Sequence, residues 1–194
     1  MTTISPELEN KLRQGFKYLN RFMLIMWRLG MGKWLNIWPA GLGRYLVITH
    51  IGRKSGQRRR TPVNYAMVDE EIYVTAGFGS VSDWYRNILA HPQVEIWLYN
   101  GWWTGVAEEI IDPAKRLPIL RQVIIDSGFA GRMAGLNPHT MSDEEFDRVT
   151  GPYRLMHLRR VAPLTGEHGP GDLAWIWPGV AMVLLPLALL RRKN

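Results

Sequence analysis

The strongest constraint on the fold is a series of six short, β-rich segments separated by turn sequences. They cover residues 44–51, 61–68, 72–76, 94–98, 103–110 and 153–161. The second and third flank an acidic turn, and the fourth and fifth alternate around Asn100-Gly101, a sequence typical of two-residue hairpins. Because few helical segments separate these strands, we predict an α+β fold with a mostly antiparallel sheet or small barrel.

Four segments have helical patterns, at residues 7–29, 84–90, 113–127 and 142–149. Asp112 is predicted to cap the third helix ahead of Pro113, and Ser142 with Glu145 forms a capping box at the start of the fourth. Residues 7–29 carry apolar side chains at three- and four-residue steps with basic residues between them. This helix therefore packs on its own domain or lies on a membrane surface.

The C-terminal part of the sequence is strongly apolar. Residues 173–190 contain no charge, and Arg191, Arg192 and Lys193 follow directly. As a helix, this stretch would extend about 27 Å, close to the ~30 Å of a bilayer's hydrocarbon layer. With Trp175 and Trp177 at one interface and the basic residues at the other, we predict a spanning anchor. An interfacial or re-entrant helix, or a helix buried against a domain, are the alternatives.

Charge is distributed unevenly along the chain. Lys and Arg number 24 against 17 Asp and Glu, and between Asn10 and Val68 there are twelve Lys or Arg and no acid. Such a field suits an anionic ligand, an anionic membrane surface or nucleic acid. No nucleic-acid-binding module surrounds it, so we expect no nucleic-acid partner. The chain has no cysteine, which excludes disulfides and thiolate metal sites, and its histidine spacing predicts no metal site.

A glycine-bounded basic loop lies between the first two predicted strands. It contains Gly52, Gly56 and Ser55 among five cationic residues between positions 53 and 60. Backbone N–H groups, the serine hydroxyl and these cations are suited to a phosphate. The spacing is that of neither a Walker loop nor a dinucleotide-binding loop. The alternative interpretation is a solvated basic hairpin loop.

Two motifs together resemble the deazaflavin-dependent nitroreductase family. The first is Gly52-Arg53-Lys54-Ser55-Gly56-Gln57, followed by Arg59, Pro62, Asn64 and Tyr65; the second is Ala76-Gly77-Phe78-Gly79, followed by Asp83-Trp84-Tyr85-Arg86-Asn87. The resemblance extends over roughly residues 15–160. It implies a split β-barrel with flanking helices and a reduced 5-deazaflavin coenzyme, F420.

The resemblance also implies two groups of cofactor-binding residues. The coenzyme's phosphodiester and oligoglutamate tail would be held by Arg53, Lys54, Ser55, Gly56, Gln57, Arg59, Arg60 and Pro62. Its ring would lie near Ala76, Gly77, Phe78, Gly79, Trp84, Tyr85 and Asn87. For Trp84 and Tyr85, packing of a short helix against the core is an equally good interpretation.

The cofactor would supply the chemistry, transferring a hydride to an electrophilic acceptor while the protein provides orientation and a proton. Tyr65 is the first candidate proton donor and His50 the second, although His50 is also explained as a strand residue without a catalytic role. Residues 127–140 contain Phe129, Met133 and Leu136 but no tyrosine. We therefore predict an apolar pocket for a lipophilic acceptor such as a quinone, nitro compound or enone.

These inferences divide the chain into four parts. Residues 1–40 form an amphipathic helix and connector, 41–162 the cofactor-binding barrel, 163–172 a linker and 173–194 a membrane-associated tail. The first ten residues lack a secretory pattern, so we expect an oxidoreductase at the cytoplasmic face of the membrane, tail-anchored or peripheral, and possibly homodimeric. The alternatives are an FMN-dependent split-barrel oxidoreductase and a non-catalytic cofactor- or lipid-binding protein.

Overall fold

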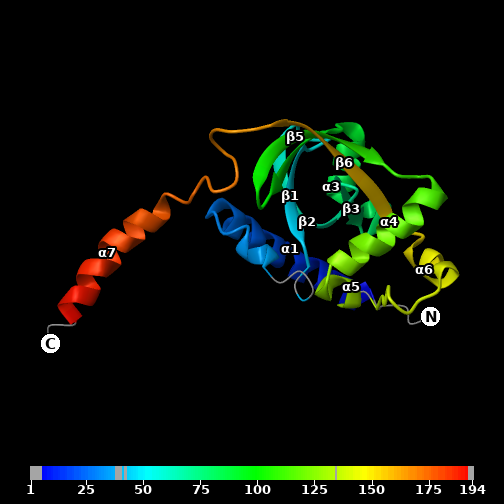
Figure 1. Ribbon diagram of the computed structural model, residues 1–194, viewed down its shortest axis with the longest axis horizontal. Helices are drawn as coiled ribbons and strands as arrows, with labels where there is room; N and C mark the ends of the chain where they lie inside the picture. Colours follow the sequence, from blue (N-terminus) through cyan, green and yellow to red (C-terminus); the bar gives the residue numbers. More distant parts are fainter. Residues whose placement is uncertain (1–5, 38–40, 42, 134, 192–194) are drawn as a thin grey trace.

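Six antiparallel strands form a closed barrel in the computed structural model, which describes residues 6–37, 41, 43–133 and 135–191 (Figure 1). The strands are β1 (Tyr45–Ile51), β2 (Arg58–Val68), β3 (Glu71–Ala76), β4 (Gln93–Leu98), β5 (Gly101–Glu109) and β6 (Arg154–Pro163). Their order around the barrel is β1-β2-β3-β6-β5-β4. The predicted six-stranded antiparallel barrel with flanking helices is confirmed.

The barrel interior is filled by side chains that alternate along each strand. Leu46, Ile48, Tyr65 and Ile96 belong to this buried cluster. The short helix α3 (Asp83–Ala90) adds Tyr85 and Ile88 to the cluster and so closes one end of the barrel. The loop between β1 and β2 lies at this same end, because α3 hydrogen-bonds to it.

Helices cover two parts of the outer barrel surface. The long helix α1 (Pro6–Arg28) places Trp27 against Val47 and Trp97, on β1 and β4. The helices α4 (Pro113–Asp126) and α6 (Asp143–Thr150) pack Leu120 and Phe146 against β2 and β6. Both predicted caps are confirmed: Asp112 accepts a hydrogen bond from the backbone N–H of Ala114 (3.0 Å), and Ser142 accepts one from that of Glu145 (3.2 Å).

Three short helical segments complete the body. They are the 3-10 turns η1 (Trp34–Asn36) and η2 (Gly79–Val81) and the helix α5 (Phe129–Met133). The sequence predicts only a glycine-rich stretch where α5 lies. Local glycines hide its periodicity, and Gly131 faces Ile124 so closely that an added Cβ would lie 2.9 Å from the Ile124 carbonyl oxygen.

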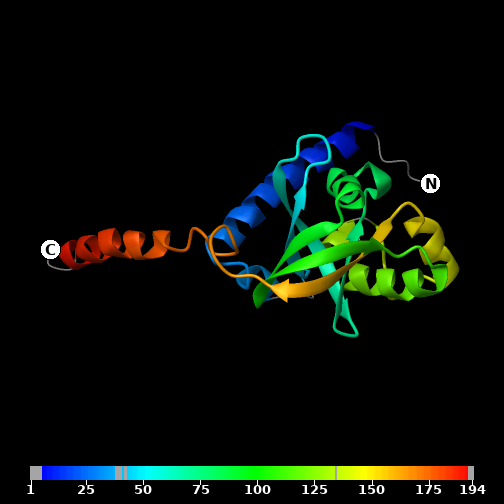
Figure 2. The same cartoon turned by 90° about the horizontal axis from the view of Figure 1, so that it is seen from above.

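The last helix, α7 (Ile176–Arg191), extends away from the barrel (Figures 1 and 2). It begins three residues later than predicted, because residues 173–175 form turns. Its 16 residues span about 24 Å, less than the ~30 Å hydrocarbon layer. Within the described residues no helix is long and apolar enough to cross a membrane, so the predicted spanning anchor is not found. Arg192 and Lys193 lie outside the described residues.

Candidate functional site

The basic loop between β1 and β2 is a tight, ordered turn. The backbone N–H of Gly52 donates to the Gln57 carbonyl (2.9 Å), and that of Gly56 donates to the Gly52 carbonyl (2.8 Å). Gly56 has a φ of 65°, a conformation that favours glycine. These bonds hold Lys54 and Ser55 at the exposed tip of the loop.

Asn87 on α3 fixes the base of this loop. Its Oδ1 accepts a hydrogen bond from the backbone N–H of Arg53 (3.1 Å) and another from the Arg53 Nη1 (2.9 Å). Arg53 also forms an ion pair with Asp83 at the first turn of α3, with an Nη2 to Oδ1 distance of 3.1 Å. The structure therefore brings together two segments that the sequence predicts to be parts of one cofactor site.

His50 lies behind this junction, with 2% of its surface exposed. Its Nδ1 is 3.3 Å from the Asn87 Nδ2, and its Nε2 is 3.1 Å from the Thr61 Oγ1. Since the Asn87 amide nitrogen can only donate, we assign the His50 proton to Nε2, which donates to Thr61. Burial lowers the pKa of His50 to about 4, and the charge of Arg59 acts in the same direction. The ring is thus neutral near pH 7 and is arranged to position Asn87; its predicted role as a proton donor stays a prediction.

Strand alternation sends the three consecutive arginines of β2 to two different faces. Arg59 pairs across the strands with His50 and shares its face, while Arg58 and Arg60 share the opposite face with Thr49. Arg58 forms an ion pair with Glu95 at 2.6 Å. Arg60 lies over the Trp97 ring, 4.7 Å from its centroid, and donates to the His168 carbonyl (2.7 Å). Arg60 therefore faces the C-terminal segment, with its pKa lowered by burial.

Lys54 and Arg59 are the loop cations that remain available for an anion. In the part of the chain that the structure describes, no carboxylate forms an ion pair with either of them. The Arg59 Nη2 lies 3.5 Å from the Ser55 Oγ, so its guanidinium stays next to the loop tip. Gly52 makes this approach possible, since a Cβ there would lie 2.8 Å from both the Arg59 Nε and the Ser55 Oγ. Gln57 is exposed beside them, and Pro62 is buried further along β2.

The predicted ring-contact segment follows β3 and leads directly into α3. Ala76 and Gly79 are buried, whereas Gly77 and Phe78 are exposed. Gly79 has a φ of 61°, and an added Cβ would lie 2.4 Å from the Pro152 carbonyl oxygen. This close approach fixes the segment against the chain ahead of β6, with its exposed residues next to the start of α3.

Trp84 and Tyr85 pack against the barrel interior, Trp84 partly buried and Tyr85 fully buried. The Tyr85 hydroxyl donates to the Glu109 Oε2 at 2.8 Å, and burial together with this carboxylate raises the pKa of Tyr85. Both side chains thus pack a short helix against the barrel core, as the alternative interpretation predicted. A contact with a coenzyme ring stays a prediction.

Tyr65 lies inside the barrel, with 2% of its surface exposed. Burial raises its pKa to about 12, while the charge of Arg44 lowers this pKa and that of Asp126 raises it. Those groups lie where β1 begins, at the opposite end of that strand from the basic loop. The structure therefore does not bring Tyr65 to the loop, and its role as a proton donor stays a prediction.

A surface pocket with a volume of about 660 Å³ lies between α4 and α5. Ile124, Ile125, Leu136 and Pro138 form its apolar wall, and Asn137 and His139 are at its polar edge. The pocket falls within the stretch 127–140 from which the sequence predicts an apolar acceptor site. Leu136 lines it as predicted, whereas the Met133 side chain lies outside the described residues.

Two residues that support the loop are missing from the predicted site. Asp83 forms an ion pair with Arg53, and Thr61 accepts a hydrogen bond from His50. Asp83 belongs to the second family motif, but its role could not be assigned from sequence because its partner Arg53 is 30 residues away. The contact of Thr61 with His50 could be predicted only from the strand register, which places Thr61 two residues beyond Arg59 on the same face of β2.

Taken together, these features define a small antiparallel-barrel protein with an ordered basic loop at one end. A family model for F420H(2)-dependent quinone reductases matches residues 28–130, more than half of the chain. The chain belongs to this family. It is therefore an oxidoreductase, and the predicted relationship to deazaflavin-dependent split-barrel enzymes is confirmed.

Several solved structures are similar to this chain at low sequence identity. A conserved hypothetical protein from Mycobacterium tuberculosis is 22% identical, with a TM-score of 0.44, over 61% of this chain and 72% of that chain. A protein of unknown function from Agrobacterium tumefaciens is 19% identical, with a TM-score of 0.46, over 68% and 55%. An FMN-binding protein related to pyridoxamine 5'-phosphate oxidase, from Nostoc punctiforme, is 14% identical, with a TM-score of 0.43, over 70% and 80%. No curated protein matches the chain.

Proposed function

We propose that this chain binds the reduced deazaflavin coenzyme F420 through its basic loop and reduces a lipophilic acceptor, with a quinone as the first candidate. The observation that carries the proposal concerns two loop cations, Lys54 and Arg59, which form no ion pair with a described carboxylate and are held beside Ser55 by a fixed turn. Phosphodiester and carboxylate groups are anions that such a donor set recognises. Membership of a family named for this coenzyme supports the assignment.

The chain's own residues fit an elongated coenzyme with anionic groups at one end. Lys54 and Arg59 would hold the anionic end, and Asn87 keeps the loop in position through Arg53. From Arg59 to Tyr65, β2 runs about 20 Å, and the last residues of β3 lie beside the middle of this strand. When bound, the coenzyme supplies a hydride from its ring.

The pocket between α4 and α5 is proposed as the acceptor site. Its wall is aliphatic, and β2 lies under the same helices because Ala66 packs in one cluster with Ile124 and Leu136. An apolar wall binds a planar lipophilic acceptor and keeps water away from it. His139 at the edge of this pocket is exposed, and we propose it as a proton donor to an acceptor bound there; the earlier candidates Tyr65 and His50 are buried and do not line the pocket.

We further propose that the enzyme works peripherally at the cytoplasmic face of a membrane, where lipophilic acceptors are concentrated. The exposed apolar residues of α7 and the basic N-terminal third of the chain support this location. We also propose that the protein forms a homodimer. Analytical ultracentrifugation of the full-length protein tests this.

The decisive experiment is a fluorescence titration of the full-length protein with oxidised F420 and, separately, with FMN. We expect the deazaflavin to bind and Lys54→Ala with Arg59→Ala to weaken it at least ten-fold at low salt, with the difference shrinking as salt rises. Arg58→Ala is the matched control, since Arg58 is the adjacent arginine on the opposite face and is paired with Glu95.

Three results would overturn the proposal. Unchanged affinity in the double variant removes the loop assignment, and binding of FMN alone assigns the barrel to the flavin alternative. Binding of F420 without oxidation of its reduced form by any quinone, nitro compound or enone assigns the chain to a non-catalytic carrier.

A further inference from the structure

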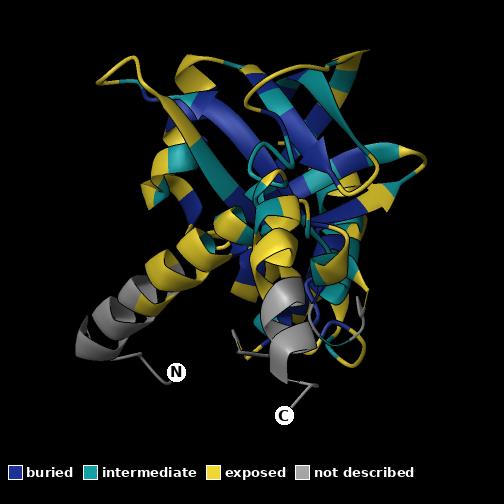
Figure 3. Ribbon diagram, turned by 90° about the vertical axis from the view of Figure 1, so that its left-hand side faces the viewer, coloured by how far each residue is buried: buried dark blue, intermediate teal, exposed yellow. Residues whose placement is uncertain are grey.

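A second surface, which differs from the basic loop in composition, combines exposed apolar and basic side chains. It comprises the outward side of α1, the turn η1 and the helix α7. In Figure 3 the described turns of both long helices are coloured mostly as exposed or intermediate, and both helices run downward from the barrel in that view. We call this surface the helical face.

The outward side of α1 carries a ridge of apolar residues, Tyr18, Phe22 and Ile25, at four- and three-residue steps. These residues lie on the opposite side of the helix from Met23 and Trp27, which are buried against the barrel. Phe22 is 55% exposed and Ile25 is 47% exposed. A helix that buries one apolar stripe in its own protein has no internal use for a second one, so this ridge is suited to an external partner.

Basic residues border this ridge. Lys17 and Arg21 lie along one side of it on α1 and are exposed, as is Lys33 just before η1. Trp34 and Ile37 continue the apolar surface, 58% and 64% exposed. No acid occurs between Asn10 and Val68. Among the described side chains of α1 and η1 the charged neighbours of these apolar residues are cations, and such a surface is complementary to an anionic lipid surface, where aromatic rings lie at the headgroup level.

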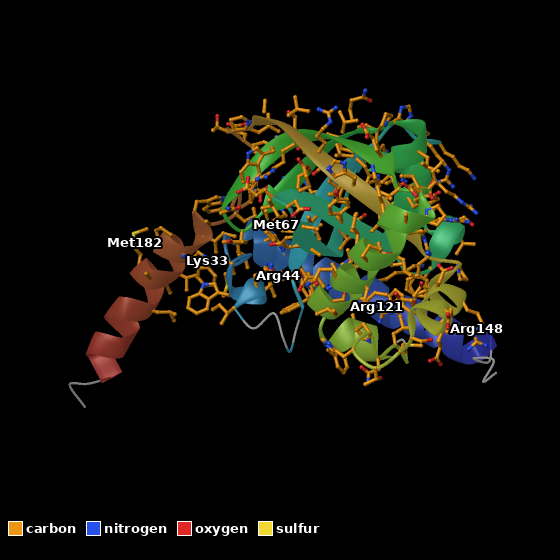
Figure 4. All side chains as sticks on the ribbon, turned by 45° about the vertical axis from the view of Figure 1, so that its right-hand side comes forward. Lys33, Arg44, Met67, Arg121, Arg148 and Met182 are labelled. Atoms are coloured by element: carbon orange, nitrogen blue, oxygen red, sulfur yellow. The ribbon has the colours of Figure 1, made fainter. Side chains whose placement is uncertain are left out.

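The second helix of this face is fixed to the first by a polar latch. Arg28 at the end of α1 forms a two-pronged ion pair with Asp172, with a closest distance of 2.9 Å. The Leu173 N–H donates to the Arg28 carbonyl (2.8 Å), and the Trp177 Nε1 donates to the Leu29 carbonyl (2.9 Å). The latch sets the base of α7 next to the end of α1 and η1. Figure 4 shows Lys33 and Met182 at this end of the molecule.

Beyond the latch, α7 presents apolar side chains to solvent. Met182 is 72% exposed and Val183 61% exposed. Transfer of such exposed apolar side chains from water to the acyl region of a lipid interface is favourable. Because the latch joins it to the α1 ridge, both would enter the same interface together.

We infer that the helical face binds the surface of an anionic bilayer, with α1 and α7 lying in its interfacial layer as two latched anchors. The inference rests on the proposed membrane location and names the surface and the lipid charge that it requires. Two weak anchors held in one rigid unit bind far more tightly than either alone, since the second engages at high effective concentration.

The test is flotation of the full-length protein with phosphatidylcholine vesicles, with and without phosphatidylglycerol. We expect binding that requires the anionic lipid. Lys17→Gln with Arg21→Gln should weaken it about ten-fold or more. Lys115→Gln with Arg159→Gln, an exposed basic pair on other elements, is the matched control and should bind as the wild type does.

The apolar contribution has its own pair of variants. Phe22→Ser with Ile25→Ser, and separately Val183→Ser, should each lower vesicle binding several-fold, whereas Ile111→Ser, at a residue 79% exposed elsewhere, should not. These positions are exposed, so their replacement leaves the fold intact. Quenching of tryptophan fluorescence by brominated lipid should accompany binding.

Equal binding of the variants and wild type would overturn the inference. So would a dimer in the absence of lipid that dissociates in the Phe22→Ser, Ile25→Ser variant, because the face would then cover a second copy of the chain. F420 affinity, measured in parallel, should be unchanged in all these variants. If the wild-type protein binds vesicles as expected but does not bind F420, the proposed function is contradicted and the inference about the helical face is not.

Discussion

The side-chain oxygen of Asn87 accepts hydrogen bonds from two atoms of Arg53, the backbone N at 3.1 Å and Nη1 at 2.9 Å. Asn87 is buried and belongs to α3, whereas Arg53 begins the basic loop. One amide thus fixes both the backbone and the side chain of the residue from which the loop starts. The conformation of the loop depends on a helix that follows it by thirty residues.

Replacement of Asn87 by alanine should therefore loosen the loop. We expect Asn87→Ala to weaken F420 binding about ten-fold and to lower the free energy of unfolding by about 1–3 kcal/mol, since buried partners lose their hydrogen bonds. Asn87→Asp keeps the oxygen that faces Arg53 and should retain most of the coenzyme affinity. Titration and urea denaturation measure both effects, and an alanine variant with wild-type affinity would contradict this role.

The buried His50 predicts how stability depends on pH. Its pKa falls from 6.5 to about 4 on folding, so below pH 6.5 the unfolded chain binds a proton that the folded chain does not. The stabilisation is complete above about pH 6.5 and is lost as the pH falls toward 4, by about 2–3 kcal/mol. Urea midpoints between pH 4.5 and 7.5 measure the slope. His50→Gln should flatten it, and an unchanged slope in that variant would assign the dependence to other groups.

Two glycines of the basic loop should respond differently to alanine. A Cβ at Gly52 would meet Arg59 and Ser55 at 2.8 Å, so Gly52→Ala should displace the Arg59 guanidinium and weaken F420 binding several-fold. Gly56 faces open space at a φ of 65°, so Gly56→Ala should cost about 1 kcal/mol of stability with a smaller effect on binding. Thermal denaturation and coenzyme titration separate the two. The reverse order of binding effects would show that the tip of the loop, not Arg59, carries the affinity.

The pocket between α4 and α5 predicts a change in acceptor preference. Ile125 lines it and is partly buried, so Ile125→Ser should raise the KM for a long-chain quinone several-fold and leave the KM for a small, water-soluble quinone nearly unchanged. F420 affinity should stay constant. Equal changes for both quinones would indicate a general loss of structure and would remove the pocket as the acceptor site.

Local sequence patterns predicted much of this fold. Asn100-Gly101 and the acidic turn 69–71 identified two hairpins, and Asp112 and Ser142 identified two helix starts, because each signal depends on neighbouring residues only. The closure of the barrel depends on the long-range pairing of β1 with β4 and of β3 with β6. No local pattern specifies that pairing, so the strand pattern predicted either a mostly antiparallel sheet or a small barrel, and the family resemblance favoured the barrel.

In the basic loop, too, long-range contacts could not be predicted from local sequence. Arg53, Lys54, Arg59 and Arg60 were predicted to be one set of cofactor-binding cations. The structure pairs Arg53 with Asp83, stacks Arg60 on Trp97 and leaves Lys54 and Arg59 available. The difference arises from strand register, because β2 begins at Arg58 and not after the arginines as predicted. For the C-terminal segment, the sequence predicted the apolar helix correctly in character, but not the ion pair between Asp172 and Arg28 that fixes its base to α1.

The three successive arginines at the start of β2 make the length of the preceding loop more critical than its composition. Removal or insertion of one residue before Arg58 would shift each arginine by one place and turn it to the other face of the sheet. Arg59 would then leave Ser55, and its neighbours would leave Glu95 and Trp97. Substitutions at the loop tip can be absorbed one at a time, whereas a single-residue change in length would disrupt three separate contacts at once.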